Sequence, residues 1–543
     1  MIRSLFVALS VLVAIATMAP AVYAQAAAPV PKTSITGFID TVTSYTRNAS
    51  NFDNNLNRND TQWYARNRGR FDIVGEVGQA KAVFGFEIDA VWGQTGSNDS
   101  SIANSGAAAG TAVATQPGTS GAFDINTDVR AIVEVKWLYV EFPAPLLPVP
   151  MIVRLGAQPF ATAASYKLAP YANGDFPGVN LYTTFSPTFK LQTTYVQVEE
   201  RLVGQQTKNG VVAVGLPNTQ NRGDDFASIM SPEITVMKGL DIKPMISIFS
   251  ANGTTSGSAR TGRGGLNTTT AYTNADGTAR GGVEEKRYTV GVDARYRMGP
   301  ISIDPTIYYQ FGNRDVVAPA NFAAAGVVPG KVYQADISAL LVDIRGGYQL
   351  GPLLLEGLGV YSTGNSARNT TLRDVNYYQP LDTDTSYLGD WGTQISSLGV
   401  DYTNAPLSAG GASGYPGTAI GWDKYGRIQV GAKATYAITP SLSVMAQANG
   451  HWTAEAVDRN GTLVVGSGVL PVFAGPTPRA NKNYVGTEFA TVLSWRFAPG
   501  LSWDNSLGYM IAGPALDALT NPAAGPRNAK DISILTSRIR LSF

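Results

Sequence analysis

The chain has 543 residues and a nearly balanced charge, with 41 Lys and Arg against 40 Asp and Glu. Nothing in this balance indicates a nucleic-acid partner. No cysteine is present, which excludes disulfides, thiolate metal sites and cysteine-linked haem. The 58 glycines and frequent Tyr and Trp suit a secreted β protein rich in turns, a description that soluble β-sandwich arrays also fit.

The first 24 residues have the pattern of a cleaved secretory signal. Arg3 precedes an apolar stretch from Leu5 to Met18, and a small residue, Ala24, stands before Gln25. A membrane anchor helix is the alternative, but the stretch is shorter than the about 20 apolar residues that such a helix needs. We therefore expect a signal peptide at 1–24, a short periplasmic segment at 25–32 and a transmembrane barrel at 33–543. The segment at 25–32 is too short for a plug domain, which argues against an energised transporter.

The clearest structural pattern lies between Glu284 and Gly312. Apolar residues occupy alternate positions from Tyr288 to Met298, and the alternation starts again after the turn at Gly299-Pro300. A period of two indicates strands, because a helix would place apolar residues every three or four positions. Each run is long enough to cross a bilayer as a tilted strand. An isolated hairpin would leave backbone groups unpaired in lipid, so further strands must close it into a barrel.

The same alternation recurs along the chain. It predicts eighteen strands, at 33–45, 61–77, 81–93, 129–142, 150–158, 179–186, 188–200, 224–238, 240–250, 284–298, 301–312, 334–349, 352–362, 424–438, 442–454, 483–497, 501–512 and 530–543. Links after even-numbered strands are short and links after odd-numbered strands are long. This rhythm is typical of outer-membrane barrels, which have short periplasmic turns, long extracellular loops and an even strand number. The sequence thus predicts one all-β antiparallel transmembrane barrel of about 18 strands, with 16 as the lower bound.

The last strand, from Asp531 to Phe543, places Leu535, Ile539 and Leu541 on one face and ends in Phe. In this it resembles Gram-negative outer-membrane proteins, whose final strand is read by the barrel-assembly machinery. Two further regions resemble large porins of the alginate-export type. They are KWLYVEF at 136–142 followed by RLGAQPF at 154–160, and GTEF at 486–489 leading to LGYMIAGPALD at 507–517. The resemblance implies a porin in the bacterial outer membrane that is surrounded by lipid, with a homotrimer as the candidate assembly.

Strand parity selects the charged side chains that face the lumen. The predicted pore-lining residues are Arg66, Arg68, Arg70, Asp72, Glu87, Asp89, Arg154, Arg287, Asp293, Arg295, Asp304, Arg345, Arg427, Lys433, Arg538 and Arg540. Burying so many ions in a dry core would cost several kcal/mol for each. A barrel of 16–18 strands is wide enough for an aqueous channel. The sequence therefore predicts a water-filled lumen.

A row of arginines at 66, 68 and 70 is the sharpest functional candidate. Guanidinium groups along a channel wall lower the barrier for anions. The alternative is structural, because Glu87 and Asp89 return on the neighbouring strand and can pair with the arginines. Both interpretations stay open, and the predicted anion preference is weak.

The long loop at 363–423 is rich in aromatic residues, which is unusual for a disordered segment. It either folds into the mouth as a constriction or packs over neighbouring loops as a lid or subunit contact. Its aromatic residues are Tyr377, Tyr378, Tyr387, Trp391, Tyr402, Tyr415 and Trp422. Asp382, Asp384 and Asp390 invite a Ca²⁺ interpretation, but they do not match an EF-hand loop, and we expect a solvated loop.

Enzymatic interpretations have little support. His451, the only histidine, is predicted to face the lumen, and no motif supplies a nucleophile beside it. We expect no catalytic residue, metal or cofactor. The leading hypothesis is a passive channel for small hydrophilic solutes. The alternatives are a substrate-specific conduit, for example for an anionic saccharide, and a barrel that serves as a surface or scaffold protein.

Overall fold

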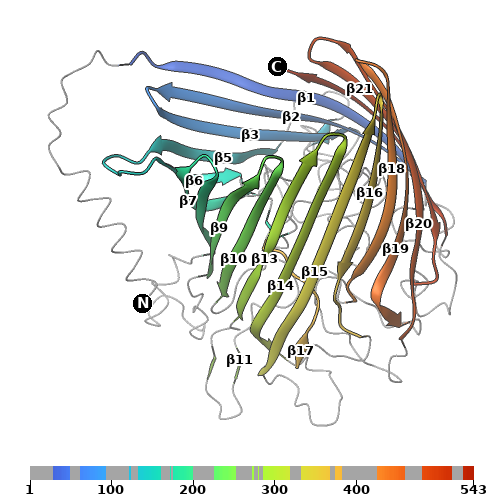
Figure 1. The fold of residues 1–543 in the computed structure, drawn as a ribbon. Helices are drawn as coiled ribbons and strands as arrows, with labels where there is room; N and C mark the ends of the chain where they lie inside the picture. The colour runs from blue at the N-terminus through green and yellow to red at the C-terminus, as the bar shows by residue number, and fades with distance from the viewer. Residues whose placement is uncertain are drawn as a thin grey trace, which may run out of the picture.

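A computed structural model describes the strands and some of the segments that join them. The described residues are 29–48, 61–92, 122–123, 132–159, 171–172, 175–199, 225–251, 272–273, 279–280, 285–317, 332–366, 373–381, 425–458, 480–515 and 530–543. They form a large antiparallel sheet that curves into a ring (Figure 1). In this part of the chain we find no helix that is both long and apolar enough to cross a bilayer. The predicted signal peptide at 1–24 lies outside the described residues.

The main sheet has twenty strands, two of which are two-residue additions, β4 (Ala122–Phe123) and β17 (Asp374–Val375). The other eighteen form the ring, so the predicted strand number is confirmed. They are β1 (Lys32–Arg47), β2 (Thr61–Val77), β3 (Ala80–Trp92), β5 (Ile132–Pro143), β6 (Met151–Pro159), β7 (Asp175–Ser186), β8 (Phe189–Glu199), β9 (Asp225–Met237), β10 (Leu240–Ala251), β13 (Glu285–Met298), β14 (Ile301–Val317), β15 (Val332–Leu350), β16 (Leu353–Ser362), β18 (Arg427–Thr439), β19 (Leu442–Asp458), β20 (Ala480–Ala498), β21 (Leu501–Ala512) and β22 (Ile532–Ser542). A separate small sheet pairs β11 (Tyr272–Thr273) with β12 (Ala279–Arg280).

The ring is closed by the two ends of the chain. β1 pairs with β2 along one edge and with β22 along the other, so that Thr41 lies opposite both Asn67 and Ile539. Beyond the strand end, Gly37 and Phe543 exchange two backbone hydrogen bonds of 2.9 and 3.0 Å. Closure leaves no ring strand with an unpaired edge in lipid, as a membrane-spanning sheet requires. Recognition of Phe543 by assembly machinery and trimer formation stay predictions.

The tight turns depend on residues that suit their backbone conformation. Gly299 and Gly351 have φ values of 55° and 57°, a backbone conformation that residues with a Cβ rarely adopt. Proline follows each of them and supplies the negative φ of the next position. In each case the glycine and the proline are the only residues between the two strands, β13 and β14 in the first turn and β15 and β16 in the second. The strands therefore return at a fixed register, which keeps each side chain on its face of the wall.

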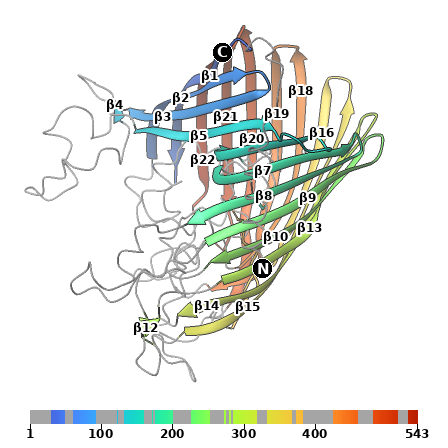
Figure 2. The same ribbon diagram turned by 90° about the vertical axis from the view of Figure 1, so that its left-hand side faces the viewer.

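The strands cross the ring obliquely. Figure 2 shows β7 to β15 slanting across the view, whereas β18 to β22 stand more upright. Tilt is a geometric consequence of closing a sheet into a barrel. Because successive side chains of a strand point to opposite faces of the sheet, alternate residues of each strand face either the enclosed lumen or the exterior.

Candidate functional site: the inner wall and its inserts

The exterior of the ring is apolar. On β22, Leu535, Ile539 and Leu541 are 54%, 50% and 42% exposed, whereas their neighbour Thr536 on the other face is 4% exposed. The outward residues of β14 and β20 repeat this pattern. Soluble proteins do not expose apolar surface on this scale. The apolar exterior of the ring therefore fits a hydrocarbon environment.

The inner wall carries ion pairs between neighbouring strands. Arg70 pairs with Glu87 and donates a 2.7 Å hydrogen bond from Nε, and Arg68 Nε lies 3.6 Å from the same carboxylate. Arg540 similarly pairs with the buried Asp40 at 2.5 Å. Two of the three arginines in the predicted row, Arg68 and Arg70, therefore pair with Glu87.

Most other predicted pore-lining residues have a partner of opposite charge. The nitrogen–oxygen distances are 2.6 Å for Arg154 and Glu141, 3.1 Å for Arg295 and Asp241, 2.5 Å for Arg297 and Asp304, 3.2 Å for Arg345 and Asp343, 3.0 Å for Lys433 and Glu356, and 2.5 Å for Arg538 and Asp504. Asp293 accepts a 2.7 Å hydrogen bond from Thr306, Arg66 and Arg427 are each 3% exposed, and Asp72 is half-buried. Asp89 lies opposite Arg68 in the β2–β3 register, and its side chain is outside the described residues.

Strict alternation missed Glu141. The β3–β5 register shifts between Gly85 and Phe86, because a β-bulge inserts one extra residue near Lys136 and Trp137. Beyond the bulge, the inward positions move from even to odd numbers. Glu141 therefore faces the lumen, where it lies 2.7 Å from Lys81 and 2.6 Å from Arg154. The bulge also lets Trp137 donate a 2.8 Å hydrogen bond to Asp175 on β7.

Two segments between strands pack against the inner wall. We call residues 171–172 the first insert and residues 373–381 the second insert. Tyr171 of the first insert bonds to Ser247 on β10 at 2.7 Å, and Leu381 of the second insert donates its backbone N–H to the Tyr171 carbonyl at 2.7 Å. β17 begins the second insert by pairing in parallel with β15 at Asp336 and Ile337. The two inserts are thus joined to each other and to the wall.

An apolar cluster lies beneath the inserts. Tyr171 and Tyr378 are fully buried against inward residues of β9, β10, β14, β15 and β16, among them Phe249 and Leu341. Burial raises the pKa of the Tyr378 phenol well above its ordinary value, since the ionised form would lose its hydration. In this part of the barrel the inward side chains are therefore buried against the inserts. Five other aromatic residues of the 363–423 loop lie outside the described residues, as do Asp382, Asp384 and Asp390.

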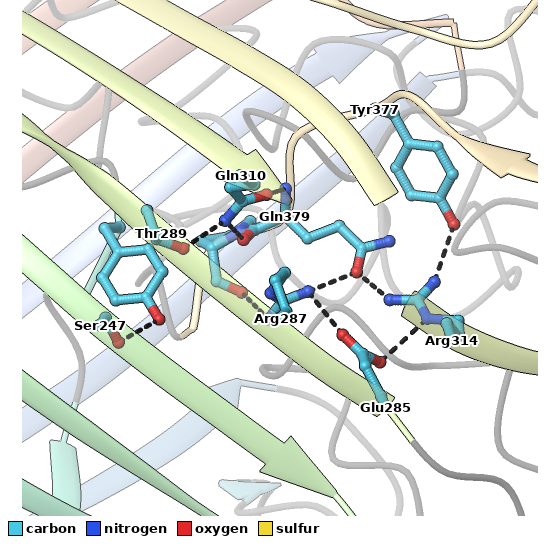
Figure 3. Close-up of polar contacts among 10 residues, drawn as sticks. Ser247, Glu285, Arg287, Thr289, Gln310, Arg314, Tyr377 and Gln379 are labelled. Carbon is cyan, nitrogen blue, oxygen red and sulfur yellow. Dashed lines mark hydrogen bonds and ion pairs between the residues drawn. The ribbon is translucent and has the colours of Figure 1, made fainter. Parts of the chain in front are cut away.

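The second insert is anchored by two buried arginines (Figure 3). Glu285 Oε1 lies 3.1 Å from Arg287, and Glu285 Oε2 accepts a 2.9 Å hydrogen bond from Arg314. The Gln379 side-chain oxygen accepts hydrogen bonds from both arginines, one of them 2.5 Å long. Gln310 on the wall completes the attachment by bonding to the Gln379 backbone N–H and carbonyl, at 2.9 and 2.7 Å. We call Glu285, Arg287, Arg314 and Gln379 the arginine clamp.

Sequence reasoning identified Arg287 but not the rest of the clamp. Gln379 is separated from Arg287 by 92 positions and from Arg314 by 65. No local pattern could pair residues so far apart in the sequence. Arg287 is 0% and Arg314 2% exposed, so these ions are stabilised by hydrogen bonds and a shared carboxylate instead of bulk water.

His451 faces the lumen from β19, and its Nε2 lies 3.6 Å from Glu488 on β20. Among the residues that the structure describes, no group of three or more His, Cys, Asp or Glu is arranged to hold a metal ion. The inner wall therefore offers ion pairs, amides and the arginine clamp as its chemistry.

These two faces define the class of the protein. A closed antiparallel ring of eighteen strands with an apolar exterior and a charged interior is a β-barrel of the Gram-negative outer membrane, with the architecture of porins.

Comparisons with known proteins show similar barrels. OccAB1 of Acinetobacter baumannii has 11% identity and a TM-score of 0.46, with 94% of this chain and 97% of that chain covered. A BenF-like porin from Pseudomonas fluorescens has 8% identity, a TM-score of 0.46 and coverage of 94% and 98%. The outer membrane protein OprD from Pseudomonas aeruginosa has 9% identity, a TM-score of 0.44 and 96% coverage of both chains. No family model and no curated protein matches the chain.

Proposed function

We propose that the protein is a channel through which small hydrophilic solutes diffuse passively across the outer membrane, with a weak preference for anions. The supporting observation is the charged inner wall, where ion pairs recur from β1 to β22 on the face opposite the apolar exterior. Side chains of this kind require water or close partners. A ring of eighteen strands has room for an aqueous path.

The anion preference has its support at the arginine row, where the guanidinium groups of Arg68 and Arg70 both pair with Glu87 on the inner wall. The arginine clamp does not contribute to it, because Arg287 and Arg314 are buried beneath the second insert. A channel wall with such groups lowers the barrier for anions, while the ion pairs elsewhere keep the effect small.

Recording from the purified protein in planar bilayers tests the proposal. We expect stepwise, ohmic conductance in potassium chloride and, in a salt gradient, a reversal potential displaced modestly toward that of chloride. Repeated reconstitution without conductance would contradict the channel and favour a surface or scaffold role.

A substrate-specific conduit is the second candidate. The inserts favour it, because they occupy part of the lumen and place Tyr378, Gln379 and Leu381 against the wall. A narrowed passage brings a solute within reach of more side chains than an open one. Conductance that a particular solute blocks at low concentration would support this candidate over unselective diffusion.

A further inference from the structure

A group of buried polar side chains on β18 and β19 lies apart from the arginine clamp. Gln429, Gln447, Asn449 and His451 face the lumen and are 0%, 6%, 1% and 4% exposed. Gln429 lies opposite His451 in the β18–β19 register, and Asn449 lies opposite Glu488 on β20. We call these four residues the amide patch.

The amide patch has many polar atoms without a hydrogen bond. Within the described residues, no hydrogen-bond partner is found for Gln447 Oε1 or Nε2, Asn449 Nδ2, Gln429 Oε1, or either ring nitrogen of His451. The one bond inside the patch is long, at 3.4 Å from Gln429 Nε2 to Asn449 Oδ1. Buried donors and acceptors left in this state carry an uncompensated desolvation cost.

Another amide cluster of the same inner wall is fully engaged. Asn180 Oδ1 accepts hydrogen bonds from Gln192 at 3.0 Å and Thr194 at 2.6 Å, and its Nδ2 donates to Tyr182 at 2.9 Å. Lys243 donates to Gln192 Oε1 at 3.2 Å. The barrel can therefore satisfy buried amides with its own side chains, which sets the amide patch apart.

The chemistry of the patch narrows the kind of ligand. A carboxamide offers two donors and one acceptor oxygen, and a neutral imidazole offers one donor and one acceptor. A hydroxyl group also donates and accepts, so several adjacent hydroxyls match such a surface. The charges beside the patch have opposite signs. Glu488 lies near His451, Arg427 lies two positions before Gln429 on the same face of β18, and the Lys433–Glu356 pair lies beyond Gln447. This arrangement gives no advantage to a charged ligand.

We propose that the amide patch binds a neutral, polyhydroxylated solute of the saccharide class during its passage through the lumen. This inference rests on the proposed channel function and assigns a substrate class to it. The saccharide hydroxyls would take the hydrogen bonds that Gln447, Asn449 and His451 do not make within the described residues.

Solute block of single channels tests the inference. With maltose as the probe, we expect a concentration-dependent reduction or interruption of the current through the wild-type channel. In Gln447→Ala and Asn449→Ala, the half-blocking concentration should rise by roughly two- to tenfold, the equivalent of one lost hydrogen bond. Gln447→Met retains the length of the side chain without its amide and replaces Gln447→Ala if that variant fails to fold.

A control variant comes from the engaged amide cluster. Gln192→Ala removes an equally buried amide, and it should leave the half-blocking concentration of maltose unchanged because the described polar atoms of that cluster already have hydrogen-bond partners. An equal rise in Gln192→Ala would overturn the assignment of the site to the amide patch.

Failure of the inference and failure of the channel proposal give different results. If the protein conducts but maltose does not block it, the channel proposal is retained and saccharide binding is overturned. If maltose blocks Gln447→Ala and the wild type equally, the channel proposal is retained and saccharide binding at the amide patch is overturned. If the wild type does not conduct, calorimetric titration with maltose in detergent micelles decides the matter. Binding that Gln447→Met weakens supports the patch, and absence of binding overturns it.

Discussion

The arginine clamp and the amide patch are both buried and polar, yet they differ in how their hydrogen bonds are satisfied. At the clamp, Gln379 comes from a distant part of the chain and accepts hydrogen bonds from Arg287 and Arg314. At the patch, the side-chain amide of Gln447 makes no hydrogen bond within the described residues. The difference shows that the barrel wall uses one polar region to hold its own insert, whereas the other has side-chain atoms without a partner in the part of the chain that the structure describes. Polar lining alone does not distinguish a structural anchor from a solute site.

The largest effect should come from breaking the clamp. Glu285→Ala removes the carboxylate that lies between Arg287 and Arg314. Loss of one partner from a buried ion pair typically costs about 3–5 kcal/mol, so we expect the second insert to detach from the wall. Single-channel conductance should rise as the passage widens.

Asp241→Ala is the matched control for the clamp variant. It breaks the pair with Arg295, whose side chain is 35% exposed, and such accessible pairs contribute about 1 kcal/mol or less. Conductance close to wild type is expected. A similar rise in both variants would contradict the anchoring role of Glu285.

The apolar side of the second insert gives the next effect. Leu381→Ala opens space in the cluster that contains Tyr171 and Tyr378, and truncation of a buried leucine costs about 2–5 kcal/mol. We expect noisier current with frequent excursions to higher conductance. Leu493→Ala, on the exterior where Leu493 is 41% exposed, should leave the current trace unchanged. If the current through Leu381→Ala were as free of excursions as the wild-type current, this packing would not be what holds the insert.

A smaller effect is expected from the arginine row. Arg70→Ala removes one of the two guanidinium groups at Glu87. A unit charge about 4 Å from a permeating ion in water is worth about 1 kcal/mol, favourable for an anion and unfavourable for a cation, so the ratio of anion to cation permeability should fall by about thirtyfold at most. Reversal potentials in a salt gradient measure this ratio. Arg297→Ala, at a more exposed pair with Asp304, should change it less, and an unchanged ratio in Arg70→Ala would leave the row with a structural role alone.

The smallest effect should appear at alkaline pH. Burial raises the pKa of Tyr171 and Tyr378 above the ordinary value of 10.0, and the neighbouring Arg287 only partly opposes this. The attached insert therefore favours neutral phenols. The neutral phenols stabilise the attachment of the insert fully below about pH 10, which is the ordinary phenol pKa expected when the insert is detached. This stabilisation declines as the pH rises toward the raised pKa values of the attached insert. Current excursions should increase above about pH 10, and Tyr171→Phe with Tyr378→Phe should abolish the increase.

Much of this fold could be predicted from the sequence because the bilayer imposes a period of two on every strand. The hairpin of β13 and β14 shows this well, since each tight turn restarts the alternation in a fixed phase. Glu141 was missed because the bulge at Lys136 and Trp137 shifts the phase without a sequence signal as strong as the alternation itself. Gln379 was missed because its partners lie on other strands. Contacts made by long loops follow no periodic sequence pattern, so the sequence alone does not predict them.

The division between a watery interior and a lipid-facing exterior can be tested at two adjacent residues of β20. Ser494 lies opposite the inward Asp504 and is half-buried, whereas Leu493 is 41% exposed on the outer face. The chain has no cysteine, so each single-cysteine variant reports one position. A charged methanethiosulfonate reagent applied to channels in a bilayer should modify Ser494→Cys and lower its conductance, and it should leave Leu493→Cys unmodified. Modification of Leu493→Cys with protection of Ser494→Cys would contradict the assignment of the two faces and the channel that depends on it.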